Sequence, residues 1–413
     1  MRRHPRTATA LVPILALAAA CARPAMQGIH STPSSRWFAT WTASPSDAPS
    51  RPPRDSVDRV PTLFNQTVRL VVRTSIGGDT VRIRVSNEYG DRVLAIGAAH
   101  IAVRESGTTI DPGTDRVLTF NGHPTLGLRP GAVAFSDPVA LAVPALHDLA
   151  ISMYLTDSAR LATRHALALQ TNYVRRGDVT GARAFMSDTS LYVWPFLVGV
   201  DVTNRAATGV IAAIGNSITD GALSTRDANT RWPNVLAARL LASSEPVKAV
   251  VNAGISGGRV LTYGAGPSAL ARFDRDVLMT PGLTHVILLE GINDIGRSAT
   301  DGVTADDIIA GYRQLIARAH DRGISIIGAT LTPASPRAPF TAVLEARRAA
   351  VNAFIRGSGE FDATIDFDIA TRDPANPLQF LPSYDSGDHL HPGDAGYRAM
   401  GDAIDLTLFR RQR

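Results

Sequence analysis

The chain has only one cysteine, Cys21, so no disulfide can form within its 413 residues, even in an oxidising compartment. It also has no long run of lysine and arginine, although its formal net charge is +5. Three of the positive charges, Arg2, Arg3 and Arg6, lie together at the N-terminus. A nucleic-acid partner is therefore not expected, because such a partner calls for a clustered basic surface.

Long apolar runs are scarce too, and the one that stands out covers residues 9–20. It is too short to span a bilayer stably, and the arginines before it and the small residues after it are typical of a secretory signal peptide. We therefore predict that residues 1–21 direct export. No later run is long and apolar enough to predict a transmembrane helix.

Cys21 directly follows Ala18-Ala19-Ala20, and a lone cysteine at this place resembles a bacterial lipoprotein box. Cys21 is thus the predicted lipidation site, which implies membrane anchoring of an exported protein in the periplasm or at the outer membrane. The usual leucine of the box is replaced by Ala18. Ordinary cleavage followed by free secretion is therefore the alternative.

Residues 22–35 are rich in proline, serine and glycine and are predicted to be a linker. From residue 36 to about residue 205 the pattern mostly has a period of two, most clearly in Val81-Arg82-Ile83-Arg84-Val85. Similar strand-like patterns cover residues 68–74, 139–143 and 149–155. The turn signal Gly77-Gly78-Asp79 predicts a hairpin between residues 68–74 and 81–85. We predict an antiparallel β-sandwich-like domain over residues 36–205.

No set of residues in this half suggests a catalytic site. Trp37, Trp41 and Trp194 could stack on sugar rings, since flat aromatic faces suit them, but packing in the core is the commoner role of tryptophan. We therefore expect all three to be core residues.

The polar segment 203–208 marks the predicted boundary, and strands then alternate with helices in residues 206–413. The predicted strands are residues 210–214, 247–251, 286–289, 324–330 and 363–367. The predicted helices are residues 233–241, 304–322, 341–356 and 395–409, with Thr304 and Asp307 capping the second. This alternation indicates an α/β domain with a parallel sheet covered on both faces. Sites in such sheets form at the carboxyl ends of the strands.

Four loops at those places hold residues suited to acyl transfer. They are residues 215–221, 252–259, 290–294 and 385–392. Ser217 can attack a carbonyl once a base such as His391 takes its proton, and Asp388 can hold that imidazole in the right tautomer. Gly257 and Asn293 can supply backbone and side-chain donors for the oxyanion.

In order, these loops resemble the GDS, glycine, GxND and DxxH blocks of SGNH (GDSL-type) hydrolases. The resemblance covers about residues 208–410, and the run from Arg231-Trp232-Pro233 to Asp388 is similar to the XynE-like esterase branch. It implies a flavodoxin-like α/β/α domain, Ser217 as nucleophile, and Asp388 and His391 as its triad partners. It also implies an oxyanion hole made by the Ser217 and Gly257 N–H groups and the Asn293 amide, with no cofactor.

One residue departs from the family. The aspartate that precedes the serine in the GDS block is Asn216 here. An amide keeps the hydrogen-bonding shape but loses the charge. Because that aspartate is not a triad member, we expect activity to survive, with an altered electrostatic environment around the loop.

Two residues compete with the assigned pair. Ser256 lies in Gly254-Ile255-Ser256-Gly257-Gly258, which fits the nucleophile elbow of α/β-hydrolases, but the glycines after it are poor helix material. His389 also lies near acids, yet only His391 has the family's spacing from Asp388.

Other polar residues of these loops have other expected roles. Asp385 is expected to shape its loop and Asp294 to tie the third loop together, while Arg259 is equally suited to substrate binding and to the surface. A metal held by His389, His391 and Asp388 is not expected, because no further ligand cluster supports it.

The expected activity is a serine esterase that releases short acyl groups, such as acetyl, from carbohydrate or aryl esters. The partners expected are small-molecule or polysaccharide esters. A lysophospholipase or lipid esterase, an O-acetyltransferase, and a carbohydrate-binding protein with a relict hydrolase domain are the alternatives.

Overall fold

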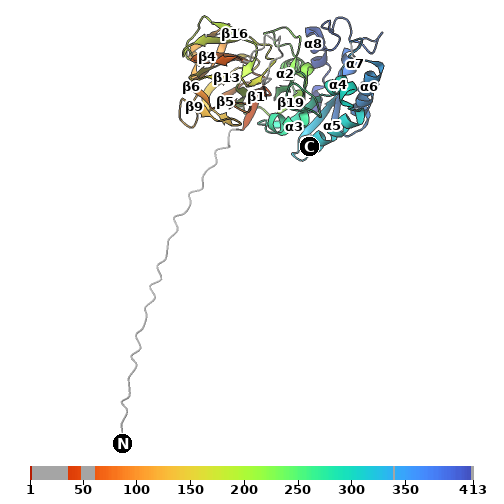
Figure 1. The fold of residues 1–413 in the computed structure, drawn as a ribbon, viewed down its shortest axis with the longest axis horizontal. Coiled ribbons are helices and arrows are strands. Elements are labelled where there is room, and N and C mark those ends of the chain that lie inside the picture. Colours follow the sequence, from red (N-terminus) through yellow and green to blue (C-terminus); the bar gives the residue numbers. More distant parts are fainter. Residues whose placement is uncertain (2–35, 48–60, 338–339, 411–413) are drawn as a thin grey trace. The chain divides into compact units, whose positions relative to one another are not determined.

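The computed structural model describes residue 1 and residues 36–47, 61–337 and 340–410, except for the side chains of residues 298 and 299. The predicted signal peptide, the linker and the lipidation site Cys21 lie outside the described residues. Residues Ser35–Arg413 form one compact unit. Figure 1 shows its two kinds of structure, strands in the first half and a sheet with helices in the second.

In the described part of the first half, the regular elements are strands and one short 3-10 helix. They are β1 (Trp37–Thr42), β2 (Ser46–Asp47), β3 (Thr62–Leu63), β4 (Gln66–Arg73), β5 (Gly78–Ser86), β6 (Leu94–Ser106), β7 (Thr109–Ile110), η1 (Pro112–Thr114), β8 (Arg116–Val117), β9 (Leu126–Leu128), β10 (Val133–Phe135), β11 (Val139–Val143), β12 (Asp148–Leu155), β13 (Ala159–Arg160), β14 (Thr163–His165), β15 (Asn172–Arg176), β16 (Thr189–Leu191), β17 (Trp194–Pro195) and β18 (Leu197–Thr203).

Two antiparallel sheets make up most of this half. One has the order β1-β18-β5-β10 with β11 beside β5, and the other has the order β16-β15-β4-β12-β6-β7 with β8 and β9 beside β6. Apolar side chains of both sheets belong to one buried cluster. Trp41 and Trp194 are in that core, in edge-to-face contact at 5.0 Å, whereas Trp37 is only half-buried and lies against the Arg82 guanidinium.

The predicted hairpin between residues 68–74 and 81–85 is wrong. Both segments are strands, but β4 pairs with β12 and β15 while β5 pairs with β18, β10 and β11 in the other sheet. After β4, the backbone N–H of Thr74 donates to the His147 carbonyl and that of Ser75 to the Thr40 carbonyl. The glycines at 77 and 78 therefore carry the chain between sheets rather than around a hairpin.

The second half is built on a parallel sheet. Its elements are β19 (Gly209–Gly215), α1 (Ser217–Asp220), α2 (Trp232–Ala242), β20 (Lys248–Gly254), α3 (Ala269–Phe273), the π-helical turn η2 (Asp274–Leu278), β21 (Leu283–Leu289), α4 (Ile292–Asp301), α5 (Ala305–His320), β22 (Ser325–Ala329), α6 (Ala342–Gly357), β23 (Ala363–Ile365), α7 (Phe367–Thr371), α8 (Asp394–Asp402) and the 3-10 helix η3 (Leu406–Phe409). The strand order is β20-β19-β21-β22-β23 with every pair parallel. This is the flavodoxin-like order, and all seven residues of β19 are buried, as in a strand covered on both faces.

Most predicted helices are present. Thr304 caps α5 in a reciprocal capping box with Asp307, as expected. The predicted helix 395–409 is wrong in its second part, because α8 ends at Asp402 and a separate turn, η3, follows. The Arg239 guanidinium donates to the carbonyls of Gly401 and Ile404, so these groups need no further helical turn to be satisfied.

The edge of the parallel sheet at β20 is covered by the strand-rich half. The Thr42 hydroxyl donates to the Asn252 carbonyl at 3.0 Å, and the Val250 N–H donates to the Ser75 hydroxyl at 3.2 Å. Polar groups that an edge strand leaves unpaired therefore find partners on side chains of the other half. The change from antiparallel to parallel pairing falls between β18 and β19, near the predicted boundary.

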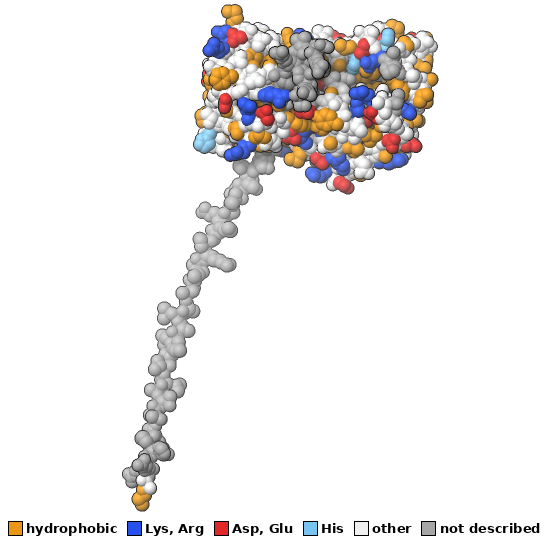
Figure 2. Space-filling model, in the orientation of Figure 1, with side chains coloured by type: hydrophobic (Ala, Val, Ile, Leu, Met, Phe, Trp, Pro, Cys, Tyr) orange, Lys and Arg blue, Asp and Glu red, His pale blue; other side chains and the backbone are white. Residues whose placement is uncertain are grey.

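Acidic and basic side chains are interspersed on the face shown in Figure 2, with apolar side chains between them. Among the helices of the described residues, none combines the length and apolarity that a bilayer crossing needs.

Candidate active site

The carboxyl ends of β19, β20 and β21 lead into three of the four loops singled out from the sequence, and hydrogen bonds join these loops. The Ile255 N–H donates to the Gly215 carbonyl at 2.9 Å, linking the second loop to the first. The Asn293 amide donates to the Gly258 carbonyl at 2.9 Å, linking the third loop to the second. The fourth loop, before α8, reaches the first through Ser217.

Ser217, His391 and Asp388 form one chain of hydrogen bonds. The Ser217 hydroxyl donates to His391 Nε2 at 2.8 Å, and His391 Nδ1 donates to an Asp388 carboxylate oxygen at 2.6 Å. The second oxygen of Asp388 accepts the backbone N–H groups of Leu390 and His391 at 3.0 and 2.8 Å. These bonds outweigh the burial of Asp388, which opposes ionisation, and lower its pKa to about 2. Asp388 is therefore ionised at neutral pH.

The turn that presents Ser217 follows from its neighbours. Asn216 is extended, and its side-chain oxygen accepts the Ile218 N–H as an N-cap of α1. Ser217 is the first residue of that helix, so its own N–H has no partner within the helix. Gly221 ends the helix in the left-handed region, with φ of 98°. Ser217 is 5% exposed, with its hydroxyl aimed at His391.

Gly257 and Asn293 have the features that oxyanion donors need. Gly257 has a φ of 78°, and a Cβ there would lie 3.0 Å from the Ala265 side chain, so the position suits glycine alone. The Asn293 amide has two N–H groups, of which one is donated to Gly258. The second can serve a reacting oxygen.

Ser256 and His389, the two competing residues, lack the surroundings of a catalytic pair. After Ser256 the chain continues without helix until Ala269, so the strand–turn–helix context of a nucleophile elbow is missing. His389 bonds Asp385 at 2.6 Å instead of a serine, and its side chain is 46% exposed. Asp385 also accepts the Gly387 and His389 N–H groups, so it shapes the loop.

Asp294 holds the second loop rather than its own. Its two carboxylate oxygens accept the N–H groups of Val260 and Leu261 at 2.9 and 3.1 Å. Burial raises the pKa of Asp294, and the Val260 and Leu261 bonds oppose this. The segment that carries Gly257 is therefore tied to the start of α4.

His165, from β14 in the strand-rich half, was not singled out from the sequence. Its Nε2 bonds Asp220 at 2.9 Å, and its Nδ1 bonds the Ser44 carbonyl at 3.0 Å. The other oxygen of Asp220 accepts the Ser256 N–H at 3.0 Å, next to Gly257. Burial disfavours the imidazolium, but Asp220 and the Ser44 carbonyl favour it and the pKa of His165 is raised. The sequence alone could not indicate this role of His165, because its partners are 55 and 121 positions away.

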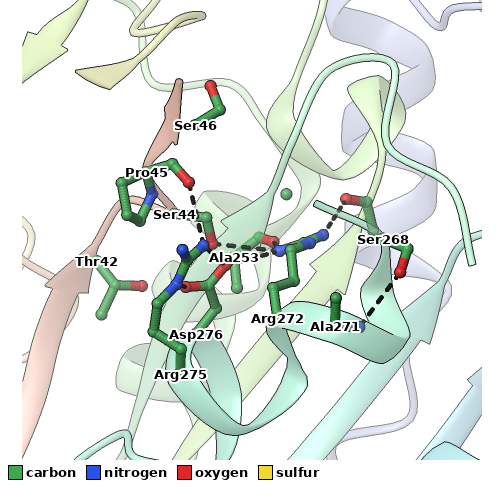
Figure 3. A network of polar contacts seen from close by, with 12 residues as sticks. Thr42, Ser44, Pro45, Ser46, Ala253, Ser268, Ala271, Arg272, Arg275 and Asp276 are labelled. Atoms are coloured by element: carbon green, nitrogen blue, oxygen red, sulfur yellow. Dashed lines mark hydrogen bonds and ion pairs between the residues drawn. The ribbon is translucent and has the colours of Figure 1, made fainter. Parts of the chain in front are cut away.

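Arg272, on α3, was missed for a similar reason. Its buried guanidinium donates to the carbonyls of Ala253 and Gly215, at 2.5 and 3.1 Å, and lies 3.6 Å from the Glu290 carboxyl. One side chain thus contacts residues at or just after the carboxyl ends of β19, β20 and β21. Figure 3 shows Arg272 beside Ser44, Ala253 and Asp276, with Arg275 bonded to Asp276 and to the Pro45 carbonyl.

Glu290 lies next to Asn216, the residue that departs from the family. It is fully buried, and burial raises its pKa to about 8, against the opposing effect of Arg272 and of the Asn216 amide. It is therefore mainly protonated at neutral pH. Asn216 places an amide, rather than a second carboxyl group, next to this buried acid.

A cleft with a cavity volume of about 550 Å³ opens beside the expected oxyanion donors. Its walls include Gly257, Asn293 and Leu390, which precedes His391. Arg259 also lines it and is ion-paired with Asp301 at 3.3 Å. Among the described residues no group of three or more His, Cys, Asp or Glu side chains is arranged to hold a metal.

Part of the chain matches a known protein family. Residues 213–399 match the model of the GDSL-like Lipase/Acylhydrolase family. Together with the strand order, this match confirms the predicted fold class, a C-terminal SGNH hydrolase domain with a parallel sheet after a mostly-strand region. It also supports a hydrolase.

Several solved structures each match about half of this chain. Axe2, an acetylxylan esterase from Geobacillus stearothermophilus, is 23% identical over 48% of this chain and 93% of its own, with a TM-score of 0.37. LAE5, an alpha/beta hydrolase from the metagenome of Lake Arreo, is 23% identical over 48% and 94%, with a TM-score of 0.38. A GDSL-like lipase from Bacteroides thetaiotaomicron is 19% identical over 49% and 88%, with a TM-score of 0.36. A search of curated proteins finds no match.

Proposed function

We propose that this chain, with its GDSL-type acylhydrolase segment, is a serine esterase that acts through an acyl-enzyme. The observation that carries the proposal is the chain of hydrogen bonds from Ser217 through His391 to Asp388, at 2.8 and 2.6 Å. A serine hydroxyl held on an imidazole that an ionised carboxylate orients is the arrangement that activates serine for attack.

In the first half-reaction, Ser217 Oγ attacks the ester carbonyl carbon while His391 Nε2 takes its proton. Asp388 stabilises the imidazolium. The N–H groups of Ser217 and Gly257 and the second Asn293 N–H stabilise the oxyanion. The carbon–oxygen bond to the alcohol then breaks, and His391 returns the proton to the leaving oxygen.

In the second half-reaction, water takes the place of the alcohol. His391 accepts a proton from water as the water oxygen attacks the acyl carbon. The bond from the acyl carbon to Ser217 Oγ then breaks, His391 returns the proton to Oγ, and the carboxylic acid leaves. A sugar hydroxyl in place of water would give transfer instead of hydrolysis, so product analysis with an acceptor sugar separates an esterase from an O-acetyltransferase.

The proposed substrates are short acyl groups, such as acetyl, on carbohydrate or aryl esters. The similarity of residues 231–388 to XynE-like esterases supports this choice, as does a cleft lined by the expected oxyanion donors. We further propose export, with lipidation at Cys21. Labelling of the expressed chain with a radioactive fatty acid should require Cys21, and a Cys21→Ala variant that keeps the label would overturn that assignment.

The test of the reaction uses purified protein with p-nitrophenyl acetate and acetylated xylan. Ser217→Ala should lower kcat by at least ~10³-fold, because a serine of this kind has no substitute. The two competing residues supply matched controls, since Ser256→Ala and His389→Gln should retain activity. Absence of hydrolysis by the native chain, or equal rates for Ser217→Ala and the native chain on every ester, would refute the proposal.

A further inference from the structure

The cleft beside the oxyanion donors is lined by three arginines and, among the described residues, by no acid. Arg259 comes from the loop after β20, Arg297 from α4 and Arg337 from the segment after β22. Three separate parts of the chain therefore bring positive charge to one cavity of about 550 Å³.

Two of these arginines lack the carboxylate partner that several other exposed arginines have within the described residues. Arg313, Arg410 and Arg175 lie at the surface and each pairs with a carboxylate within 2.7 Å. Arg297 and Arg337 are also exposed, but neither makes an ion pair or side-chain hydrogen bond within the part of the chain that the structure describes. Their guanidinium groups can thus accept an anionic partner without first breaking an ion pair there.

Arg259 is held differently. Its side chain is only 12% exposed, and it bonds Thr262 and Asp301 at 3.1 and 3.3 Å. This fixes a third positive group on the cleft wall next to Gly257, although Asp301 offsets part of its charge.

Apolar and aromatic side chains line the cleft as well. Phe340, Leu344 and Leu390 line it together with Tyr263. An ester whose carbonyl lies at Gly257 and Asn293 can place a carbon skeleton against apolar lining residues and a charged group against the arginines. Guanidinium groups bind carboxylate, sulfate and phosphate through paired hydrogen bonds, which suits such a group.

We propose that the ester substrate carries an anionic group and that Arg297 and Arg337 bind it. The proposal rests on the esterase function proposed above and names the substrate class of that same site. The negative group belongs to the alcohol part, as in an acidic sugar or a carboxylated phenol, or to the acyl part. The chemistry of recognition is the same in both.

The test compares esters that differ only in charge. For the alcohol part, 4-acetoxybenzoate is compared with 4-acetoxybenzamide. For the acyl part, the 4-nitrophenyl monoester of adipic acid is compared with its methyl ester. Each kcat/KM is divided by the rate of hydroxide-catalysed hydrolysis of the same ester. We expect the native chain to favour the anionic member of one pair by about 10-fold, mainly through KM.

Two variants and a change of salt concentration test whether these arginines cause the preference for the anionic ester. Arg297→Gln combined with Arg337→Gln should reduce the preference to about 1, mainly by raising KM for the anionic member. Arg313→Gln, a surface arginine outside the cleft, is the control and should leave the preference as it was. Raising NaCl from about 0.05 to about 0.5 M should weaken the preference, because exposed charges are screened.

The outcomes separate the two proposals. If no ester is cleaved, the esterase function is wrong. If neutral esters are cleaved but neither anionic member is preferred, or the double variant keeps the preference, then the anionic substrate class is wrong and the esterase function stands.

Discussion

Glu290 is the residue whose charge should most affect stability with pH. Its pKa rises from 4.5 in the unfolded chain to about 8 in the folded one, so between these values the folded chain holds a proton that the unfolded chain has released. The free energy of unfolding should therefore fall as the pH rises from about 5 to 8. Glu290→Gln cannot ionise and should show a smaller fall, measured by urea denaturation at each pH. An equal fall in both proteins would contradict the shifted pKa, and Glu245→Gln, at an exposed ion pair, is the control.

Single residues were the part of the site most open to prediction. Ser217, Asp388 and His391 lie in short segments whose order and spacing are recognisable, and the structure brings them together. Arg272, His165 and Glu290 have no such signature. Each works through backbone carbonyls or carboxylates that only the finished fold places beside it, so no local pattern could indicate them.

Among elements, the loop between β20 and α3 depends most on others for its shape. It carries Gly257 but contains no helix or strand, and Asp294 holds it at Val260 and Leu261. Asp294→Ala should lower kcat by about 10–100-fold with little change in KM, because a displaced donor costs transition-state stabilisation more than binding. Steady-state kinetics measure this, and Asp306→Ala on the exposed side of α5 is the matched control. A change confined to KM would argue against the positioning role.

Elements with a clear period were predictable, and connections between them were not. The stripe of α5 and its capping box follow from side-chain spacing alone. The pairing of β4 and β5 does not, since a glycine-containing turn can close a hairpin or carry the chain to a second sheet. Similarly, α8 ends at Asp402 because of Arg239, which lies on another helix.

The whole molecule depends on contacts between its two halves. His165 bonds Asp220, Ser44 bonds Arg272, and Thr42 and Ser75 cover the β20 edge. Residues 206–413 expressed alone should therefore give less than about 1% of native esterase activity, although all residues of the proposed triad are present. Circular dichroism and gel filtration should show a poorly folded or aggregated product. A soluble fragment with native activity would show that the first half is dispensable.

The predicted limits, 36–205 and 206–413, remain a prediction at this scale. The change of pairing between β18 and β19 lies close to them, yet Ser35–Arg413 forms one compact unit. A change of pattern along the sequence shows where one architecture stops. It does not show whether two architectures share a core.

The covered edge of β20 has a consequence for how the chain is made. Synthesis and export both proceed from the N-terminus, so residues 36–205 can fold first, with the hydroxyls of Thr42 and Ser75 ready before β20 is available. The newly made β20 edge can then pair with the strand-rich half of its own chain before it pairs with another chain. Reversing the order of the two halves by circular permutation would leave the β20 edge uncovered until the strand-rich half has been synthesised. The permuted chain should therefore aggregate during synthesis.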